Sequence, residues 1–288
     1  MTFADRAVNA FLGLAMGDAY GRTLEFARGN TVRTMPVDTS NLRWTDDTHM
    51  SIYLAEAVLE HGPGPLDEDR LGRAVAEAFL RWERDPLTPS TAPGNTCLAG
   101  VRNYRHGGDW RGSGIAHSDG CGAVMRVVAL PMRFGGDELD RAARISAVVT
   151  HAHPNALEAA EATCRLLRAL LDGKPLTADL VLSLAGPNLT GEALRAAVAH
   201  GCDEHAIPPG DGGWRSPSAL GIGVAAALSG RDFEGAIDLA ARIDGDSDST
   251  ACIAGMLLGA AGLPLPGDWL PGLQDRGRIE GLARRVTG

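Results

Sequence analysis

The sequence predicts an all-α fold, and three observations support this prediction. Apolar residues recur at spacings of three and four through most of the chain, which is the period of an amphipathic helix. Alternating runs typical of half-buried strands are scarce. The composition combines 37 glycines with only 5% aromatic residues, which favours closely packed helices over an aromatic-rich β-sandwich. We therefore expect helices packed around a core of small side chains.

Helical periodicity begins near the N-terminus and continues along most of the chain. It is clearest from Ala7 to Ala15, from Ile52 to Leu59 and from Leu71 to Phe79. The Gly/Pro-rich breaks between periodic segments are too short to be domain linkers, so we expect a single domain over residues 1–288. The other expected helices are 121–132, 138–150, 155–171, 191–204, 217–229, 232–242 and 249–262, followed by a basic, solvated helical stretch over 276–285.

Charge and cysteine content exclude several classes of protein. The formal net charge of −9 argues against sequence-independent binding to nucleic acid or to an anionic membrane, so nucleic acid is expected only as a modified substrate. The five cysteines are widely spaced and odd in number, which indicates neither a disulfide framework nor a zinc ribbon. Asp5, Arg6 and Asp18 interrupt the N-terminal apolar run, so a cytoplasmic protein without a signal peptide is expected.

A first acidic cluster, Thr45-Asp46-Asp47-Thr48, directly precedes the helix expected from Met50 to Glu60. One interpretation is a helix N-cap, because Thr45 can accept a backbone N–H bond and the two carboxylates complement the helix dipole. The other interpretation is a metal site, because two carboxylates and a hydroxyl form a compact set of the hard oxygen ligands that Mg²⁺ requires. The cluster alone does not separate the two.

A second acidic cluster, from Asp244 to Ser249, precedes the helix expected over 249–262. It holds more oxygen ligands than one helix cap can use. It is not an EF-hand, because Ser249 stands where Gly is needed and Gly255 stands where Glu is needed. Ala251, Gly255 and Gly259 follow one another at i and i+4, which lets this helix lie close against a neighbour. The two clusters, each at a helix start, could therefore share one pair of divalent ions.

Other segments carry weaker signals. Gly17 and Gly21 suit helix packing and a C-cap, whereas Asp18 and Glu25 beside them are candidate general bases near the metals. The loops Gly94-Asn95-Thr96 and Ser118 to Gly122 lead into helices, where free backbone N–H groups can bind phosphate. The alternative, which is more common, is that the glycines only allow the chain to turn. Thr150-His151-Ala152-His153-Pro154 has no third metal ligand at helical spacing, so hydrogen bonding is the favoured role of its histidines.

Taken in order, these motifs resemble those of the ADP-ribosylglycohydrolase family, which includes the dinitrogenase reductase-activating glycohydrolases. The resemblance spans about residues 10–262 and rests on GDAYG with Glu25, WTDDT, GNT, SDGCGAVMR, THAHP and DGDSDSTACIAG. It implies an all-α orthogonal bundle with two Mg²⁺ ions, or Mn²⁺ in their place, in a cleft. The implied reaction cleaves ADP-ribose from a modified protein side chain, a small molecule or another acceptor and releases ADP-ribose.

The resemblance also implies roles for individual residues. Glu25, Asp47 and Asp246 would be catalytic, with Glu25 or a metal-bound aspartate accepting the proton of the attacking water. The loop from Ser118 to Gly122 would hold the diphosphate, and His151 would bind the ribose side of the ligand. The implied metal ligands are Thr45, Asp46, Asp47, Asp246, Asp248 and Ser249, and the implied substrate-binding residues are Asn95, Thr96, Ser118, Asp119, Gly120, Cys121, Gly122 and His151.

The sequence departs from the family pattern at two positions that bear on adenine recognition. Cys121 stands where Asn is usual, and Asp119 stands where some relatives place an aromatic residue. Cys121 is expected to be a loop residue and not a nucleophile, because no motif places a base beside it. Two alternatives are a metal-dependent phosphoesterase acting on an ADP-ribose-like ligand and an inactive relative that only binds ADP-ribose. An inactive relative is expected to lack some of the metal ligands, whereas all six implied metal ligands are present in this sequence.

Overall fold

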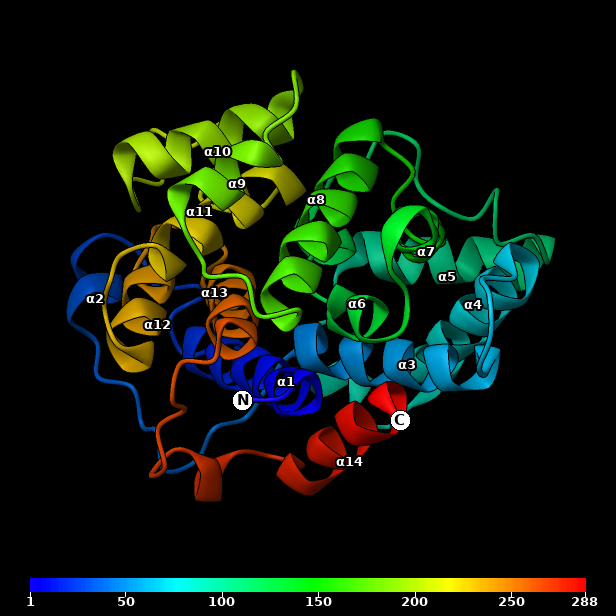
Figure 1. Cartoon of the computed structure of the whole chain (residues 1–288), viewed down its shortest axis with the longest axis horizontal. Helices are drawn as coiled ribbons and strands as arrows, with labels where there is room; N and C mark the ends of the chain where they lie inside the picture. The colour runs from blue at the N-terminus through cyan, green and yellow to red at the C-terminus, as the bar shows by residue number, and fades with distance from the viewer.

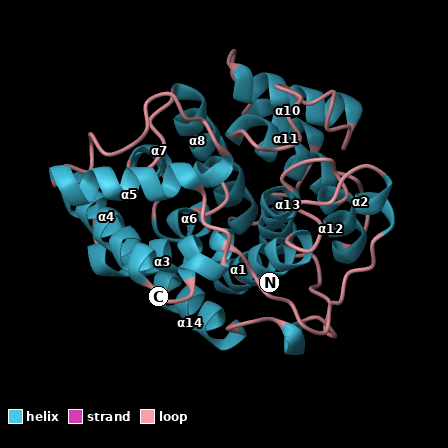
Figure 2. Cartoon of the chain, turned by 180° about the vertical axis from the view of Figure 1, so that it is seen from behind, coloured by secondary structure: helices cyan, strands magenta, loops and turns pink.

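The chain is all-α, as the sequence predicts. The structure is a computed structural model that describes residues 1–288, and it contains no β-strand, only two isolated β-bridges between loops (Figures 1 and 2). The α-helices are α1 (Phe3–Gly21), α2 (Asn30–Thr34), α3 (Asp46–His61), α4 (Glu68–Arg84), α5 (Asn95–Gly107), α6 (Leu130–Arg133), α7 (Gly136–Val148), α8 (Pro154–Leu171), α9 (Ala178–Ser183), α10 (Leu189–His200), α11 (Ser216–Ala227), α12 (Phe233–Ala241), α13 (Ser247–Ala261) and α14 (Arg276–Thr287). Four short 3₁₀ helices are η1 (Thr88–Ser90), η2 (Cys121–Ala123), η3 (Val127–Ala129) and η4 (Leu270–Gly272).

Helices α1 and α13, far apart in the sequence, pack backbone to backbone near the middle of the molecule (Figure 1). A Cβ atom added to Gly13 would lie 2.2 Å from the carbonyl oxygen of Gly255, and one added to Gly17 would lie 2.0 Å from that of Ala251. Glycines in place of larger residues allow this approach, because no side chain separates the two backbones. The prediction that the helix of the second acidic cluster lies close against a neighbour is confirmed.

Gly17→Ala is expected to destabilise the fold by about 1–3 kcal/mol, the usual cost of an extra methyl group in a well-packed core. The added carbon would meet backbone atoms of α13, which cannot rotate away as a side chain can. Gly281→Ala in α14 is the matched control, because nothing lies within 4 Å of its added Cβ and alanine favours the helix by up to about 1 kcal/mol. Thermal unfolding of both variants checks this, and an unchanged Tm for Gly17→Ala would contradict the packing described here.

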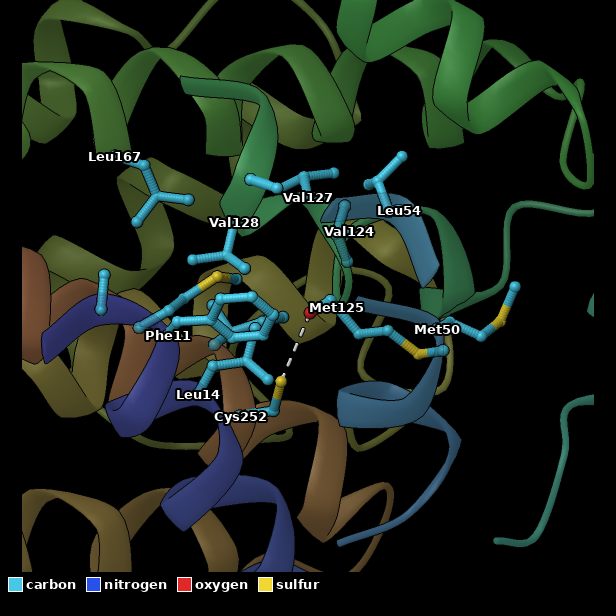
Figure 3. Packing of buried hydrophobic residues seen from close by; sticks show 14 of the residues in the cluster. Phe11, Leu14, Met50, Leu54, Val124, Met125, Val127, Val128, Leu167 and Cys252 are labelled. Atoms are coloured by element: carbon cyan, nitrogen blue, oxygen red, sulfur yellow. Dashed lines mark hydrogen bonds between the residues drawn. The ribbon is translucent and has the colours of Figure 1, made fainter. Parts of the chain in front are cut away.

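The core beside these helices joins segments from distant parts of the chain. Phe11 and Leu14 of α1 lie close to Val128 of η3 and to Cys252 of α13, and all four are buried (Figure 3). The Cys252 thiol donates a hydrogen bond to the backbone carbonyl of Met125, with a sulfur–oxygen distance of 3.4 Å. Close packing of this kind limits relative movement of α1, η3 and α13.

The expected helix over 121–132 is wrong. This segment is divided into η2, η3 and α6, and Pro131 stands in the first turn of α6, where its missing N–H is tolerated. The sequence prediction also omits α2, α5 and α9. Helices α2 and α9 have only five and six residues, and α5 buries few apolar side chains, so its periodicity is weak.

Helix α14 packs on the rest of the molecule through one face. Ile279, Leu282 and Val286 are buried, while Arg284 and Arg285 are exposed. The expected basic stretch over 276–285 is therefore solvated on one side only. None of the fourteen α-helices combines the length and the apolar character needed to cross a membrane.

Candidate active site

The N-termini of α3 and α13 open into a pocket of about 340 Å³. All of the site residues predicted from the sequence line this pocket except Asp18, Thr45, Ser118 and Asp119. Both acidic clusters and the two predicted glycine turns therefore meet at one place. The lining residues are Glu25, Phe26, Asp46, Asp47, Ala92, Pro93, Gly94, Asn95, Thr96, Cys97, Gly120, Cys121, Gly122, Met125, His151, Trp214, Asp246, Asp248 and Ser249.

A side chain of α1 fixes the start of α3. Asp18 is fully buried and accepts hydrogen bonds from the backbone N–H groups of Thr45 and Thr48, both at 2.9 Å, and from their hydroxyl groups at 2.8 and 2.5 Å. Burial, together with the charge of Asp248, raises the pKa of Asp18 to about 7. The interpretation of Asp18 as a loop carboxylate and candidate general base is wrong, because it lies within α1 and its oxygens hold the N-terminus of α3.

Thr45 is the N-cap of α3, in agreement with the first interpretation of this cluster. Its buried hydroxyl donates to Asp18, and its contact with the Asp47 backbone nitrogen is long, at 3.4 Å. Asp46 and Asp47 follow in the first turn of α3 and line the pocket. Asp46 accepts the N–H of Gly94 at 3.0 Å, whereas Oδ2 of Asp47 is buried without a hydrogen-bond partner. Burial raises the pKa of both carboxyl groups well above the ordinary value, and Asp248 adds to the effect.

Asp248 connects the second acidic cluster to Glu25. After burial, its charge is the largest cause of the raised pKa values of Glu25 and Asp246. Glu25 belongs to the turn after α1 and is only 7% exposed, so burial and then the charge of Asp248 raise its pKa to about 9. The same two causes raise the pKa of Asp246 well above the ordinary value. No three acidic, histidine or cysteine side chains have the spacing of a metal-binding group.

Cys121 contacts the second acidic cluster directly. Its thiol donates to Oδ2 of Asp246 at 2.8 Å, and its sulfur lies 3.4 Å from the Ser249 hydroxyl, which donates to it. Burial and the charge of Asp246 raise the pKa of this thiol well above the ordinary value. A protonated thiol is a poor nucleophile, which supports the prediction that Cys121 is a loop residue without a covalent role.

Two aromatic residues that the sequence analysis missed also line the pocket. Phe26 is 71% exposed and Trp214 is 39% exposed, and such large apolar surfaces at a pocket are typical of a ligand-binding site. Phe26 follows Glu25 directly in the sequence. Trp214 follows Gly212 and Gly213, which both have positive φ, so this Gly-Gly-Trp turn is the signal that could have located it.

Comparison with known proteins identifies the family of the chain. The family model described as ADP-ribosylglycohydrolase matches residues 1–288. The chain belongs to the ADP-ribosylglycohydrolase family. The enzyme class predicted from the sequence is confirmed with it.

Two curated relatives and one solved structure show how far the likeness to ADP-ribosylglycohydrolases extends. ADP-ribosyl-[dinitrogen reductase] glycohydrolase of Rhodospirillum rubrum is 28% identical over 92% of this chain and 89% of its own. ADP-ribosylarginine hydrolase Tri1 of Serratia proteamaculans is 28% identical over 98% of this chain and 79% of its own. A solved structure described as an ADP-ribosylglycohydrolase-related protein complex has a TM-score of 0.80 and 30% identity, covering 99% and 98% of the two chains.

In this ADP-ribosylglycohydrolase, Ser118 and Asp119 lie behind the turn that lines the pocket. Asp119 forms an ion pair with Arg215, at 2.8 Å from Nε, and accepts the side-chain amide of Asn155 at 2.9 Å. Burial alone would raise the pKa of Asp119, but these hydrogen bonds outweigh it and lower the pKa. Ser118 Oγ is 3.0 Å from Thr96 Oγ1. The prediction that Ser118 and Asp119 contact substrate is not supported by this geometry, in which both anchor the turn.

Proposed function

We propose that this ADP-ribosyl hydrolase uses two divalent cations, Mg²⁺ or Mn²⁺, to cleave ADP-ribose from a modified arginine side chain of a protein. The observation that carries the proposal is the meeting of two buried acidic clusters at one pocket. The names of the two curated relatives, one acting on ADP-ribosylarginine and one on an ADP-ribosylated protein, favour this acceptor over serine, a nucleic-acid base or a small molecule.

The side chains that would hold the cations are Asp46, Asp47, Asp246, Asp248 and Ser249. They offer oxygen atoms only, which suits Mg²⁺ and Mn²⁺ better than Zn²⁺. Oδ2 of Asp47 is buried and unpartnered, and buried carboxylates are costly unless a cation or a proton offsets their charge. Thr45 would support this group from behind, because its hydroxyl already bonds to Asp18. The chemistry of these donor atoms therefore fits a pair of divalent cations, whose binding would draw the side chains closer together than they lie in the metal-free structure.

Glu25 has the position of a general base. Its carboxyl group lines the pocket and is only 7% exposed. Bound cations would supply Lewis-acid stabilisation of the sugar and water oxygens. Glu25 would take one proton from the attacking water, while the water oxygen bonds to the anomeric carbon of the ribose. The bond from that carbon to the acceptor nitrogen breaks, Glu25 gives the proton it took to that nitrogen, and free ADP-ribose and the unmodified side chain remain.

The two glycine turns beside the acidic clusters would bind the nucleotide part of the substrate. The turns at Gly94-Asn95-Thr96 and Gly120-Cys121-Gly122 lack bulky side chains and leave room for a diphosphate. His151 lies against the second turn, since its ring would be 3.3 Å from a Cβ added to Gly120. Position 119 carries no aromatic residue, so Phe26 and Trp214 provide the exposed aromatic faces of this pocket.

The test is incubation with proteins or nucleic acid carrying ADP-ribose on arginine, serine, cysteine or a base, each with Mg²⁺ and with excess EDTA. We expect release of free ADP-ribose from the arginine substrate with Mg²⁺. With EDTA the rate should fall by at least about 100-fold, because metal stabilisation of the transition state amounts to several kcal/mol. Mn²⁺ should restore the rate better than Zn²⁺.

Each other outcome contradicts a defined part of the proposal. Full turnover in excess EDTA would exclude the role of the cations. Release of AMP or inorganic phosphate would identify a phosphoesterase, and ADP-ribose binding without turnover of any substrate would identify an inactive relative. Faster release from serine or cysteine than from arginine would exclude arginine as the preferred acceptor.

A further inference from the structure

Arg126 is a buried cation without a carboxylate partner. It is 0% exposed, it forms no ion pair, and its guanidinium lies 4.6 Å from the centre of the Phe79 ring. Its Nη2 donates to the carbonyl oxygen of Ser146 at 2.9 Å and to the Thr150 hydroxyl at 2.7 Å. A buried charge held only by neutral groups is costly, so its presence needs an explanation beyond packing.

The bond from Arg126 decides which way the Thr150 hydroxyl points. An arginine can only donate, so Thr150 Oγ1 must accept this bond and has its own proton to place elsewhere. Nδ1 of His151 is 2.8 Å away, whereas the only other acceptor near the hydroxyl, the carbonyl of Ala147, is at 3.5 Å. The hydroxyl therefore donates to Nδ1 of His151, and that nitrogen carries no proton.

We infer that Arg126, acting through Thr150, holds His151 in the tautomer with its proton on Nε2, so that His151 donates a hydrogen bond to a diphosphate oxygen of the ligand and not to the ribose side that the family resemblance implies. The inference rests on the proposed function for the identity of that ligand. The ring lies against the turn assigned to the diphosphate, with Nε2 3.3 Å from a Cβ added to either Gly120 or Gly122. Arg126 and Thr150 are positioning residues, because neither lines the pocket.

The surroundings of His151 favour the neutral ring. Burial, followed by the positive charge of Arg126, lowers the pKa of His151 to about 3 against a smaller opposing effect of Asp119. A neutral imidazole with an occupied Nδ1 offers the ligand one donor and no acceptor. His151 then contributes to binding and takes no part in proton transfer, which leaves that role to Glu25.

The tautomer can be measured without ligand and without any variant that disturbs the fold. Long-range ¹H–¹⁵N correlation spectra of protein labelled with ¹⁵N-histidine distinguish the two neutral tautomers and the cation, and His151→Gln assigns the resonance among the eight histidines. At pH 7 we expect a neutral ring with the proton on Nε2. A proton on Nδ1, or on both nitrogens, would overturn the inference regardless of whether the proposed function holds.

Thr150→Val tests the role of the hydroxyl, with Thr150→Ser as the matched control that retains it. In Thr150→Val the ring should lose its single tautomer, and affinity for ADP-ribose and for ADP, measured by calorimetry, should fall roughly five- to tenfold, the value of one hydrogen bond. Thr150→Ser should restore both signals. An unchanged tautomer and affinity in Thr150→Val would overturn the inference, whereas failure of the wild-type protein to bind ADP-ribose would instead contradict the proposed function.

Discussion

Replacing Glu25 with glutamine is expected to lower kcat by roughly 10²–10⁴-fold, the usual contribution of a general base. Burial and the charge of Asp248 raise the pKa of Glu25 to about 9, so without cations its carboxyl group keeps its proton at neutral pH. Glutamine has nearly the shape of the protonated, uncharged acid, so the variant should fold and bind ADP-ribose as the wild type does. Steady-state rates over a Mg²⁺ series, with calorimetry for ADP-ribose, measure both effects.

The control for this variant is Glu234→Gln, because Glu234 is exposed on α12 and does not line the pocket. Its kcat should equal that of the wild type. Excess Mg²⁺ should not rescue Glu25→Gln, since the lost group accepts a proton and its removal leaves the aspartates in place. A near-normal kcat would remove Glu25 from the mechanism, and lost ADP-ribose binding would show that the residue shapes the pocket instead.

The sequence predicts a helix correctly where the segment has a clear amphipathic pattern of its own. The expected helix over 155–171 coincides with α8 almost to the residue, because its amphipathic pattern is long and uninterrupted. The segment over 121–132 has equally apolar residues but is buried from all sides, so its pattern does not distinguish a helix from short 3₁₀ turns. Helix α5 is held in place largely by contacts from other parts of the chain, such as that of Gly100 with Val149 and Thr150.

The same limit applies to the site. The clusters at Asp46 and Asp246 could be predicted because each is contiguous in the sequence. The role of Asp18 could not, because its hydrogen bonds reach residues 27 and 30 positions away and exist only once α1 and α3 are packed together. The ion pair between Asp119 and Arg215 spans 96 positions, so the sequence shows two separate charges and no reason to join them.

Packing of α1 on α13 explains why Glu25 reaches the second acidic cluster. A Cβ added to Gly21, the last residue of α1, would lie 2.3 Å from the carbonyl oxygen of Ser247, the first residue of α13. The end of one helix thus touches the start of the other, and Glu25, four residues later, is carried to Asp248. The small residues of α1, for which the sequence suggests only a role in helix packing, therefore also determine where Glu25 lies in the proposed active site.

Asp246→Asn is expected to weaken metal binding and yet stabilise the metal-free protein. Asp246 is proposed as a direct ligand, so its loss should reduce Mg²⁺ affinity by more than the roughly 10–100-fold typical of an outer-shell partner. Activity at limiting Mg²⁺ should fall accordingly and recover in part at excess Mg²⁺. Asp244→Asn is the matched control, because Asp244 is in the same loop but outside the pocket, and its only ion pair is with the exposed Arg28.

The stabilisation in EDTA follows from the direction of the pKa shift. Burial and Asp248 raise the pKa of Asp246 in the folded protein above its value in the unfolded chain. The protonated carboxyl group therefore stabilises the fold fully at pH values below the unfolded pKa, and this stabilisation is lost as the pH rises towards the folded pKa. Asparagine resembles the protonated acid at every pH and keeps the contribution. In EDTA at pH 7.5 the Tm of Asp246→Asn should therefore exceed that of the wild type by a few degrees, and the difference should vanish near pH 4. Saturating Mg²⁺ should reverse the order, because the cations bind the folded wild type more tightly than the folded variant. Calorimetric Tm values under these conditions test this prediction. A variant less stable than the wild type in EDTA would contradict it, because it would mean that Asp246 stabilises the metal-free fold through its hydrogen bond with Cys121.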